Sequence, residues 1–402
     1  MKERTTMEFR IAGEQDLPQI MDLWDYCFEK KGDPFFQWYF REYCLQHNVV
    51  LGGFDGAGRL CNMLHLNPYQ ILLRGREETA PYIVGVATDP AARGHHLTRG
   101  LLASAFALLR GRGIDYVLLM PIYAGIYQPY GFAFCYEKHG YDMPLGELSS
   151  LPEGKGRFVI RRYDRLDKEL FANVYAACSA KYNGLAIRTD FQWDKLLATH
   201  TLENVQAAVA FDGEGRPDGY MFYKVTDDRM FFVQELLAGT AGARLALLRF
   251  AGAHRSAAER FRWLAPADDA THLYLPDASH AGTVRPAMMA RCLDVVHVLQ
   301  EYEVPENCPD LACTIAVEDG LVEGNNVALT LVVDGGALHV LPADTSVPGA
   351  AMDIGTFTQL LSGAYGAARL EDAGLLEATD PRVVRALDTL FPPCVNYINE
   401  DY

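Results

Sequence analysis

Residues 84–100, with the sequence VGVATDPAARGHHLTRG, constrain the fold of this chain more than any other stretch. A run of β-branched residues predicts a strand that ends in a turn with Asp89 and Pro90. Residues 93–96 then lead into the apolar stretch LLASAFALLR, in which leucines recur at helical spacing. A strand, loop and helix in this order direct successive backbone N–H groups and the positive end of the helix dipole at one point. We therefore expect an anion-binding site here, of the kind that most often holds a diphosphate.

The composition describes a globular protein and argues against a nucleic-acid partner. Half of the 402 residues are apolar and 22% are charged, so the chain can form hydrophobic cores, and its length predicts two or three domains. The formal net charge of −16 would repel phosphate backbones. Such a charge suits a cationic substrate attracted by the overall field, and it equally suits a protein that is acidic only for solubility.

Nine cysteines occur singly, without a CxxC pair or a Cys/His cluster of zinc-ligand spacing. This usage predicts reduced thiols in a cytoplasmic protein. The adjacent His95 and His96 face apart at the start of a helix, so we expect no metal site there. The charged start MKERTTMEFR and the lack of an apolar run of ~20 residues predict a soluble protein without a membrane span.

The order of strands and helices predicts three domains, 1–150, 151–285 and 286–402. The first reads as a mixed α/β domain, and the second repeats its order more weakly. Where the first domain has its loop, the second has only the short sequence AGT at residues 238–240. We therefore expect the second domain to be non-catalytic. The third domain predicts an α+β fold with one antiparallel sheet.

Three segments occur in an order that resembles one family of acetyltransferases. They are ATDPAARGHHLTRGLL, AGIYQPYGF at residues 124–132, and TFTQLLSGAYGAARLEDAG ahead of the terminus FPPCVNYINEDY. The first segment resembles the acetyl-CoA pyrophosphate loop of GCN5-related N-acetyltransferases (GNAT), and the whole order resembles the enhanced intracellular survival (Eis) family. The resemblance spans nearly the whole chain. It implies an α/β and α+β fold of tandem GNAT-like domains and a sterol-carrier-protein-like (SCP2) domain, assembled as a homo-oligomer, a hexamer or a trimer.

The resemblance also implies acetyl-CoA as co-substrate and indicates the residues that bind it. The backbones of Val86, Ala87 and Thr88 would pair with the pantetheine amides as an added strand does. Ile122 and Tyr123 would line the thioester. The diphosphate would lie against Arg93, Gly94, His95, His96, Leu97, Thr98 and Arg99. His96 departs from the family, in which glycine is usual, and its side chain would crowd the phosphates unless it turns outward.

Two residues are implied as catalytic. Tyr127 matches the general-acid tyrosine of the family, and a phenol with a pKa near ~10 is protonated at neutral pH. The alternatives are that Tyr127 is simply packed in its loop, or that Tyr123 or Tyr130 serves instead. The terminal carboxylate of Tyr402 matches the family's general base, although the family usually ends in phenylalanine. The alternative is a frayed end, which is the default for chain termini.

The acceptor implied by the resemblance is a cationic amine: a polyamine, an aminoglycoside or a lysine side chain. Carboxylates and aromatic rings suit such a ligand because they offer ion pairs and cation–π contacts. The candidates are Asp25, Glu29, Asp33, Glu400 and Asp401, with Trp24, Phe36 and Trp38 as aromatic walls.

Two other functions remain open from the sequence. The histidine pair in place of a glycine-rich loop is consistent with a degenerate loop, and therefore with a non-catalytic binding or assembly protein. A sterol-carrier-like domain could also bind lipid in an apolar cavity, lined by Met288, Met289, Leu360 and Leu361.

Overall fold

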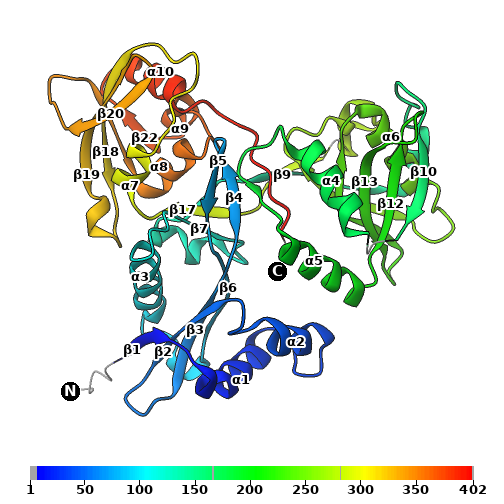
Figure 1. Cartoon of the computed structure of the whole chain (residues 1–402), viewed down its shortest axis with the longest axis horizontal. Coiled ribbons are helices and arrows are strands. Elements are labelled where there is room, and N and C mark those ends of the chain that lie inside the picture. The colour runs from blue at the N-terminus through cyan, green and yellow to red at the C-terminus, as the bar shows by residue number, and fades with distance from the viewer. Residues whose placement is uncertain (1–6, 165–166, 281, 401–402) are drawn as a thin grey trace. The chain divides into compact units, whose positions relative to one another are not determined.

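The computed structural model describes residues 7–164, 167–280 and 282–400, and these form two compact units (Figure 1). The first unit combines the chain up to Tyr136 with Ala287–Cys394. The second combines Glu137–Pro286 with the segment that begins at Val395. The chain therefore leaves the first unit after Tyr136, returns at Ala287, and ends its described part in the second unit.

A seven-stranded sheet forms the centre of the N-terminal part of the first unit. Its strand order is β1-β2-β3-β6-β7-β17-β8. The strands are β1 (Glu8–Ile11), β2 (Val49–Phe54), β3 (Leu60–Asn67), β6 (Tyr82–Thr88), β7 (Tyr116–Leu119), β8 (Ala133–Phe134) and β17 (Met289–Cys292). Only β6 and β7 pair in parallel, and the other neighbours are antiparallel. A parallel pair needs a crossover, which here is α3 (Leu97–Arg110).

Helix α3 buries one face, with Leu101, Ala105 and Phe106, in the same core as strand residues of β2 and β7. This is the face that the spacing of its apolar residues predicts. The preceding helices are α1 (Leu17–Cys27) and α2 (Pro34–Trp38). Helix α2 is followed directly by a π-helical turn, Tyr39–Tyr43.

A hairpin of β4 (Gln70–Leu73) and β5 (Arg76–Thr79) extends beyond this sheet. Its two turn residues, Arg74 and Gly75, have φ angles of 50° and 82°. Two successive positive φ angles are typical of the type I′ turn that suits the twist of a hairpin.

The C-terminal part of the first unit has a five-stranded sheet of order β20-β19-β18-β21-β22. Its strands are β18 (Leu311–Glu318), β19 (Val327–Asp334), β20 (Ala337–Pro342), β21 (Gly349–Asp353) and β22 (Leu376–Ala378); its helices are α7 (Val295–Gln300), α8 (Ile354–Leu361), α9 (Ala367–Asp372) and α10 (Pro381–Leu390). The pair β18–β21 is parallel, so the antiparallel sheet expected here contains one exception. Met288, Met289, Leu360 and Leu361, which were expected to line a lipid cavity, are each at least 97% buried.

The second unit is a seven-stranded sheet of order β10-β12-β13-β14-β15-β9-β16. The strands are β9 (Glu137–Pro144), β10 (Val159–Tyr163), β12 (Gln206–Phe211), β13 (Pro217–Val225), β14 (Met230–Ala238), β15 (Arg260–Pro266) and β16 (Thr283–Pro286), with α4 (Lys168–Ser179), the short β11 (Leu185–Ala186), α5 (Asp190–Leu202) and α6 (Ala241–Gly252). As in the first sheet, one parallel pair, β14–β15, is connected by a helix, α6.

Strands that follow one another in sequence are exchanged between the two sheets. β8 lies in the first sheet and the next strand, β9, in the second; β16 lies in the second sheet and β17 in the first. Inside the first sheet, β17 pairs with β7 on one edge and with β8 on the other. Each GNAT-like sheet is therefore completed by a segment distant in sequence. The expected boundaries near residues 150 and 285 stay predictions.

Candidate active site

Strand β6 separates from β7 beside a bulge. Their parallel pairing covers only Tyr82 and Ile83, although β6 continues to Thr88. On its other edge the register with β3 shifts next to Gly85, which has a φ of +59°. A Cβ at Gly85 would lie 2.4 Å from the Trp24 ring, so glycine is required both by the backbone and by the space. The backbone of residues 86–88 thus lies where β6 and β7 no longer pair.

The loop after β6 is fixed at its start by Asp89. The Asp89 carboxylate accepts from the Ala91 N–H at 2.8 Å and caps a short 3-10 turn, Pro90–Ala92. The Asp89 N–H donates to the carbonyl of Cys61 on β3 at 2.8 Å. These bonds attach the loop to the sheet.

Beyond this turn the loop exposes a series of unused donors. Within the described residues, the backbone N–H groups of Gly94, His95, His96, Leu97 and Thr98 have no hydrogen-bond acceptor. Residues 94–96 are exposed, and Leu97 begins α3. Five successive N–H groups at the positive end of a 14-residue helix are therefore available to an anion, and the anion site expected from the sequence stays a prediction.

His96 adopts the left-handed conformation that glycine would adopt without strain. Its φ and ψ are 55° and 31°, and it is the N-cap residue of α3. This explains why glycine is usual at this position in the family that the sequence resembles. The His96 side chain is exposed to solvent.

Two arginines on the loop and helix lack carboxylate partners. Arg93 Nε donates to the Thr88 carbonyl at 3.3 Å, and Arg99 Nη2 donates to the Gly320 carbonyl at 2.7 Å. Neither forms an ion pair with any described residue. No described carboxylate therefore compensates the charge of either guanidinium group, and both can attract an anion at the loop.

Tyr127 lies between two 3-10 turns, Ala124–Ile126 and Gln128–Tyr130. Its ring packs against the α3 core and meets Phe132 edge-on at a centroid distance of 6.1 Å. Burial raises the pKa of the phenol above its ordinary value of 10.0, so the hydroxyl is protonated at neutral pH. No described residue hydrogen-bonds to that hydroxyl. Tyr127 therefore carries a proton that is available to a ligand.

The neighbouring candidates differ in exposure. Ile122 is 97% exposed and Tyr123 69%, so neither is part of the core. Tyr130 is half-buried against the same cluster as Tyr127. The segment after β7 thus combines two half-buried phenols, those of Tyr127 and Tyr130, with the exposed side chains of Ile122 and Tyr123.

The aromatic residues proposed as walls of an amine site lie largely in the core. Trp24 and Phe36 are 3% and 2% exposed, and Trp38 is half-buried. The Trp24 indole donates to Glu29 at 2.7 Å and lies under the β6 bulge.

The acidic residues of the same group are engaged locally. The Asp25 carboxylate accepts from the Lys31 N–H at 2.7 Å. Asp33 caps α2 by accepting from the Phe35 N–H at 2.7 Å.

Glu400 lies in the second unit, in a buried ion cluster. Arg188 donates to Glu400 at 2.7 Å and to both oxygens of Glu235 at 2.9 Å, and all three residues are at most 9% exposed. This arrangement fixes Glu400, the last described residue, within the second unit. Asp401 and Tyr402 lie outside the described residues.

Two buried polar side chains under the β6 bulge, those of His65 and Asn62, are not among the site residues that the sequence suggests. His65 on β3 is fully buried, with Nδ1 2.8 Å from the Tyr39 hydroxyl and no partner for Nε2. Burial lowers the pKa of His65 to about 3, so the ring is neutral. The Asn62 side chain, also on β3, is buried without a hydrogen-bond partner in the part of the chain that the structure describes. A lone histidine in an apolar strand does not stand out in the sequence. The position of His65 under the β6 bulge is visible only in the structure, where its ring lies against Gly85.

The corresponding helix of the second unit has a closed N-terminus. Thr240 caps α6 by accepting from the Ala243 N–H at 3.2 Å, and its hydroxyl donates to the Asp218 carboxylate at 2.6 Å. The Lys155 carbonyl lies 2.2 Å from where a Gly242 Cβ would be. An anion would meet a carboxylate and a backbone oxygen here.

The space beside β14 is also occupied. Pairing of β14 with β15 ends at Val233, and the next carbonyl, that of Gln234, accepts from the Asn399 side-chain amide at 2.9 Å. The C-terminal segment thus takes the place in the second sheet that is open beside β6 in the first. Both observations locate the candidate site in the first unit.

Family models recognise all three parts of the chain. Two models described as acetyltransferase (GNAT) domains match residues 8–135 and 184–292, and a sterol carrier protein domain matches residues 295–399. The chain consists of two acetyltransferase domains and a sterol carrier protein domain. This confirms the expected α/β and α+β fold class and the expected kind of enzyme, an N-acetyltransferase.

Several solved structures share this three-domain fold. A probable N-acyltransferase from Enterococcus faecalis is 23% identical with a TM-score of 0.86, covering 99% of this chain and 100% of its own. A GCN5-related N-acetyltransferase from Kribbella flavida is 20% identical with a TM-score of 0.81, covering 99% of both chains. Eis1 from Mycobacterium abscessus is 17% identical with a TM-score of 0.74, covering 99% of this chain and 100% of its own. At these identities the likeness concerns the fold. No curated protein matches the sequence.

Two kinds of feature are absent from residues 7–164, 167–280 and 282–400. No helix in these ranges is long and apolar enough to cross a membrane. No group of three or more histidine, cysteine, aspartate or glutamate residues in them is placed to hold a metal ion.

Proposed function

We propose that the first GNAT domain transfers an acetyl group from acetyl-CoA to the amine of a cationic acceptor, and that the chain is a member of the Eis family. The observation that carries this proposal is the row of free N–H groups at residues 94–98, next to the unpaired charges of Arg93 and Arg99. A diphosphate supplies the oxygens and negative charge that these groups lack.

The chemistry that follows is direct transfer. The pantetheine amides pair with the free edge of β6 at residues 86–88, which places the thioester next to Tyr127 and the exposed Ile122 and Tyr123. The neutral amine attacks the thioester carbonyl, the C–N bond forms, and the C–S bond breaks. The departing thiolate takes its proton from the Tyr127 hydroxyl, and the amine loses one to a base. We assign that base to the Tyr402 carboxylate, as the resemblance implies.

The acceptor class follows from charge. A net charge of −16 attracts cations to the whole molecule, which suits a polyamine, an aminoglycoside or a lysine side chain. Nine cysteines, all free thiols, are consistent with a cytoplasmic location, and the family resemblance with a homo-oligomer, a hexamer or a trimer.

The test combines cofactor binding with turnover. Calorimetry with acetyl-CoA measures binding, and thiol release with polyamines, aminoglycosides and lysine peptides measures transfer. His95→Glu places a carboxylate at the free N–H groups and should weaken acetyl-CoA binding at least ~10-fold, because it adds like charge beside the diphosphate. His339→Glu, at another exposed histidine of the first unit, is the control and should bind normally.

Equal binding by the two variants would refute the loop as the diphosphate site. Binding without thiol release from any amine would instead favour a non-catalytic binding or assembly protein.

A further inference from the structure

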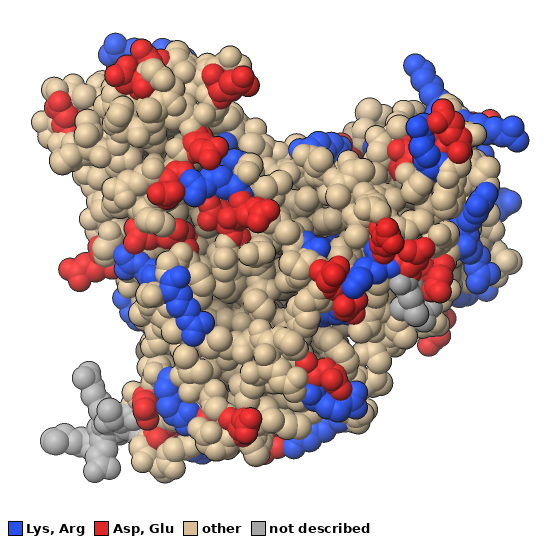
Figure 2. Space-filling view, in the orientation of Figure 1, with Lys and Arg blue, Asp and Glu red and all other residues tan. Residues whose placement is uncertain are grey.

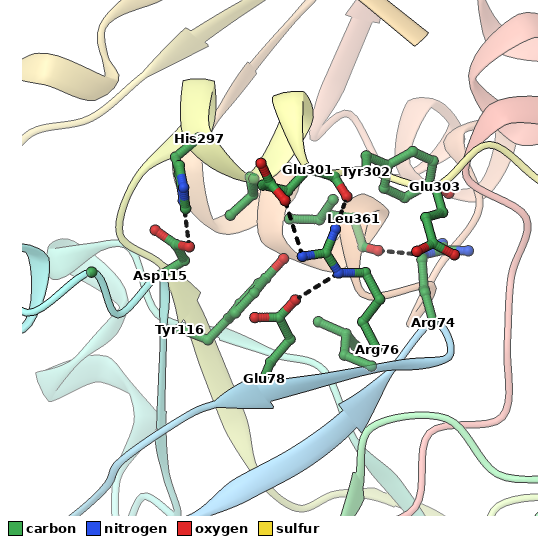
Figure 3. Close-up of a pocket in the computed structure, with 13 residues that line it drawn as sticks. Arg74, Arg76, Glu78, Asp115, Tyr116, His297, Glu301, Tyr302, Glu303 and Leu361 are labelled. Carbon is green, nitrogen blue, oxygen red and sulfur yellow. Dashed lines mark hydrogen bonds and ion pairs between the residues drawn. The ribbon is translucent and has the colours of Figure 1, made fainter. Parts of the chain in front are cut away.

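A second cavity, of about 340 Å³, lies in the first unit, and none of its lining residues belongs to the candidate active site. Its walls are the β4–β5 hairpin, the start of β7, and helix α7 with the residues that follow it (Figure 3). Figure 2 shows acidic and basic side chains gathered on the face that carries α7 and this hairpin. The volume is that of a small-molecule site.

The cavity has a fixed frame. Arg74, at the tip of the hairpin, donates to the carbonyls of Leu361, Leu360 and Pro392 at 2.6, 3.3 and 3.1 Å. This guanidinium therefore attaches the hairpin to the sterol carrier domain. Because its guanidinium donates to these three carbonyls, Arg74 is not available to bind a ligand.

Tyr116 supplies the first sign of a ligand. The residue is 93% buried, and its hydroxyl has no hydrogen-bond partner among the described residues. Figure 3 shows the hydroxyl pointing into the cavity, beside the Glu78 carboxylate. A hydroxyl in this position can donate one hydrogen bond to a ligand and accept another from it.

The charges around the cavity leave room for a cation and not for an anion. Arg76 lies 3.5 Å from Glu78 and 3.3 Å from Glu301, and His297 lies 2.7 Å from Asp115. All the basic groups are thus engaged, whereas each carboxylate keeps free lone pairs. Burial raises the pKa of Glu78 and that of Asp115 above the ordinary value of a carboxyl group, and a cation beside them would oppose this shift. Arg76 also donates to the Glu301 backbone carbonyl, whereas its ion pairs with the two carboxylates are longer than the ~2.8 Å of a strong charge-assisted bond, so an ammonium can compete for those carboxylates while Arg76 keeps its bond to the carbonyl.

We propose that this cavity binds a small organic cation through a primary ammonium group held between the Glu78 carboxylate and the Tyr116 hydroxyl. An ammonium has three donors, which match the oxygens of Glu78, Tyr116 and Glu301. A divalent metal fits less well, because no group of three or more histidine, cysteine, aspartate or glutamate residues in the described part of the chain is placed to hold one. The site is separate from the proposed acetyl transfer and does not depend on it.

The experiment is calorimetry of the full chain with 1,5-diaminopentane at low salt, without acetyl-CoA. Glu78→Gln and Tyr116→Phe should each weaken the binding at least ~10-fold, since each removes a hydrogen bond to a charged group. Glu77→Gln is the matched control: it lies on the same strand, points to solvent, and should bind within about twofold of the parent. The uncharged 1,5-pentanediol and the dianion glutarate should not bind.

Acetyl transfer by Glu78→Gln is measured in parallel and should be unchanged. Diamine binding that is equal in the parent, Glu78→Gln and Tyr116→Phe would overturn the proposal, because the amine would then sit elsewhere. Glutarate binding tighter than the diamine would overturn it as well. If the parent chain releases no thiol with any amine but binds the diamine in a Glu78-dependent way, the proposed function is refuted and the proposed cation site is supported.

Discussion

At the scale of single residues, the proposed role of Tyr127 as general acid can be tested most directly. Its phenol is protonated and has no partner in the described chain. If it supplies the proton to the departing thiolate, Tyr127→Phe should lower kcat by ~10²–10⁴-fold and leave the Kd for acetyl-CoA unchanged. Tyr130→Phe, half-buried in the same cluster, is the control and should retain near-normal kcat. The reverse pattern would move the role to Tyr130.

His96 gives a second prediction, about stability. Its left-handed backbone costs a non-glycine residue about 1–2 kcal/mol, whereas glycine adopts it freely but loses more chain entropy on folding. His96→Gly should therefore leave the free energy of unfolding unchanged or raise it by up to ~1 kcal/mol in urea titration. His95→Gly, without a positive φ, should lower it. A loss at His96 as large as at His95 would mean that the His96 side chain contributes contacts that offset the strain.

At the scale of elements, the helices and strands with regular periodicity were predictable. Strand β6 and helix α3 follow from their apolar spacing, and the loop between them follows from its composition. Helix α5 was not predicted, because its buried side mixes Trp193 and Leu197 with Lys195 and His200 and so shows no apolar stripe. The pairing of β17 with β7 joins segments about 170 residues apart, and local patterns carry no information on such contacts. For the same reason, the sequence suggests Glu400 as a site residue but does not indicate that it pairs with Arg188.

Helix α5 leads to a pH prediction. Burial lowers the pKa of Lys195 to about 7, against 10.5 in the unfolded chain, so between these values the unfolded state binds more protons and stability rises with pH. Lys195→Met removes this dependence. The variant should be more stable than the parent at pH 6–7, and the difference should shrink toward pH 10, in urea titrations at several pH values.

Lys155→Met, at an exposed lysine of the same unit, serves as the control and should follow the parent at every pH. If Lys195→Met were less stable throughout this range, the lysine would be charged and paired in the folded state.

At the scale of the whole molecule, the order of segments along the sequence differs from their grouping into sheets. A chain cut at residue 150 keeps β8 and β9 but lacks β17, which joins β7 to β8 in the first sheet. The second sheet likewise depends on β9 and on residues after Val395, whose Asn399 and Glu400 bond to Gln234 and Arg188. The ion cluster is buried, so removal of Arg188 would leave two carboxylates uncompensated. Each acetyltransferase domain therefore needs a segment contributed from beyond its own stretch of sequence.

This organisation predicts which shortened chains fold. The Ala287 N–H donates to the Tyr136 carbonyl at 2.9 Å, so the ends left by deleting residues 137–286 are already adjacent. A chain of residues 1–136 joined by a short glycine–serine linker to residues 287–394 retains β17 and both sheets of the first unit. It should unfold cooperatively in urea and, under the proposed function, bind acetyl-CoA. Residues 1–150 alone should show no cooperative transition, because β7 and β8 would expose unpaired edges. Cooperative unfolding of the 1–150 chain would show that β17 is dispensable and that the first domain ends where the sequence predicts.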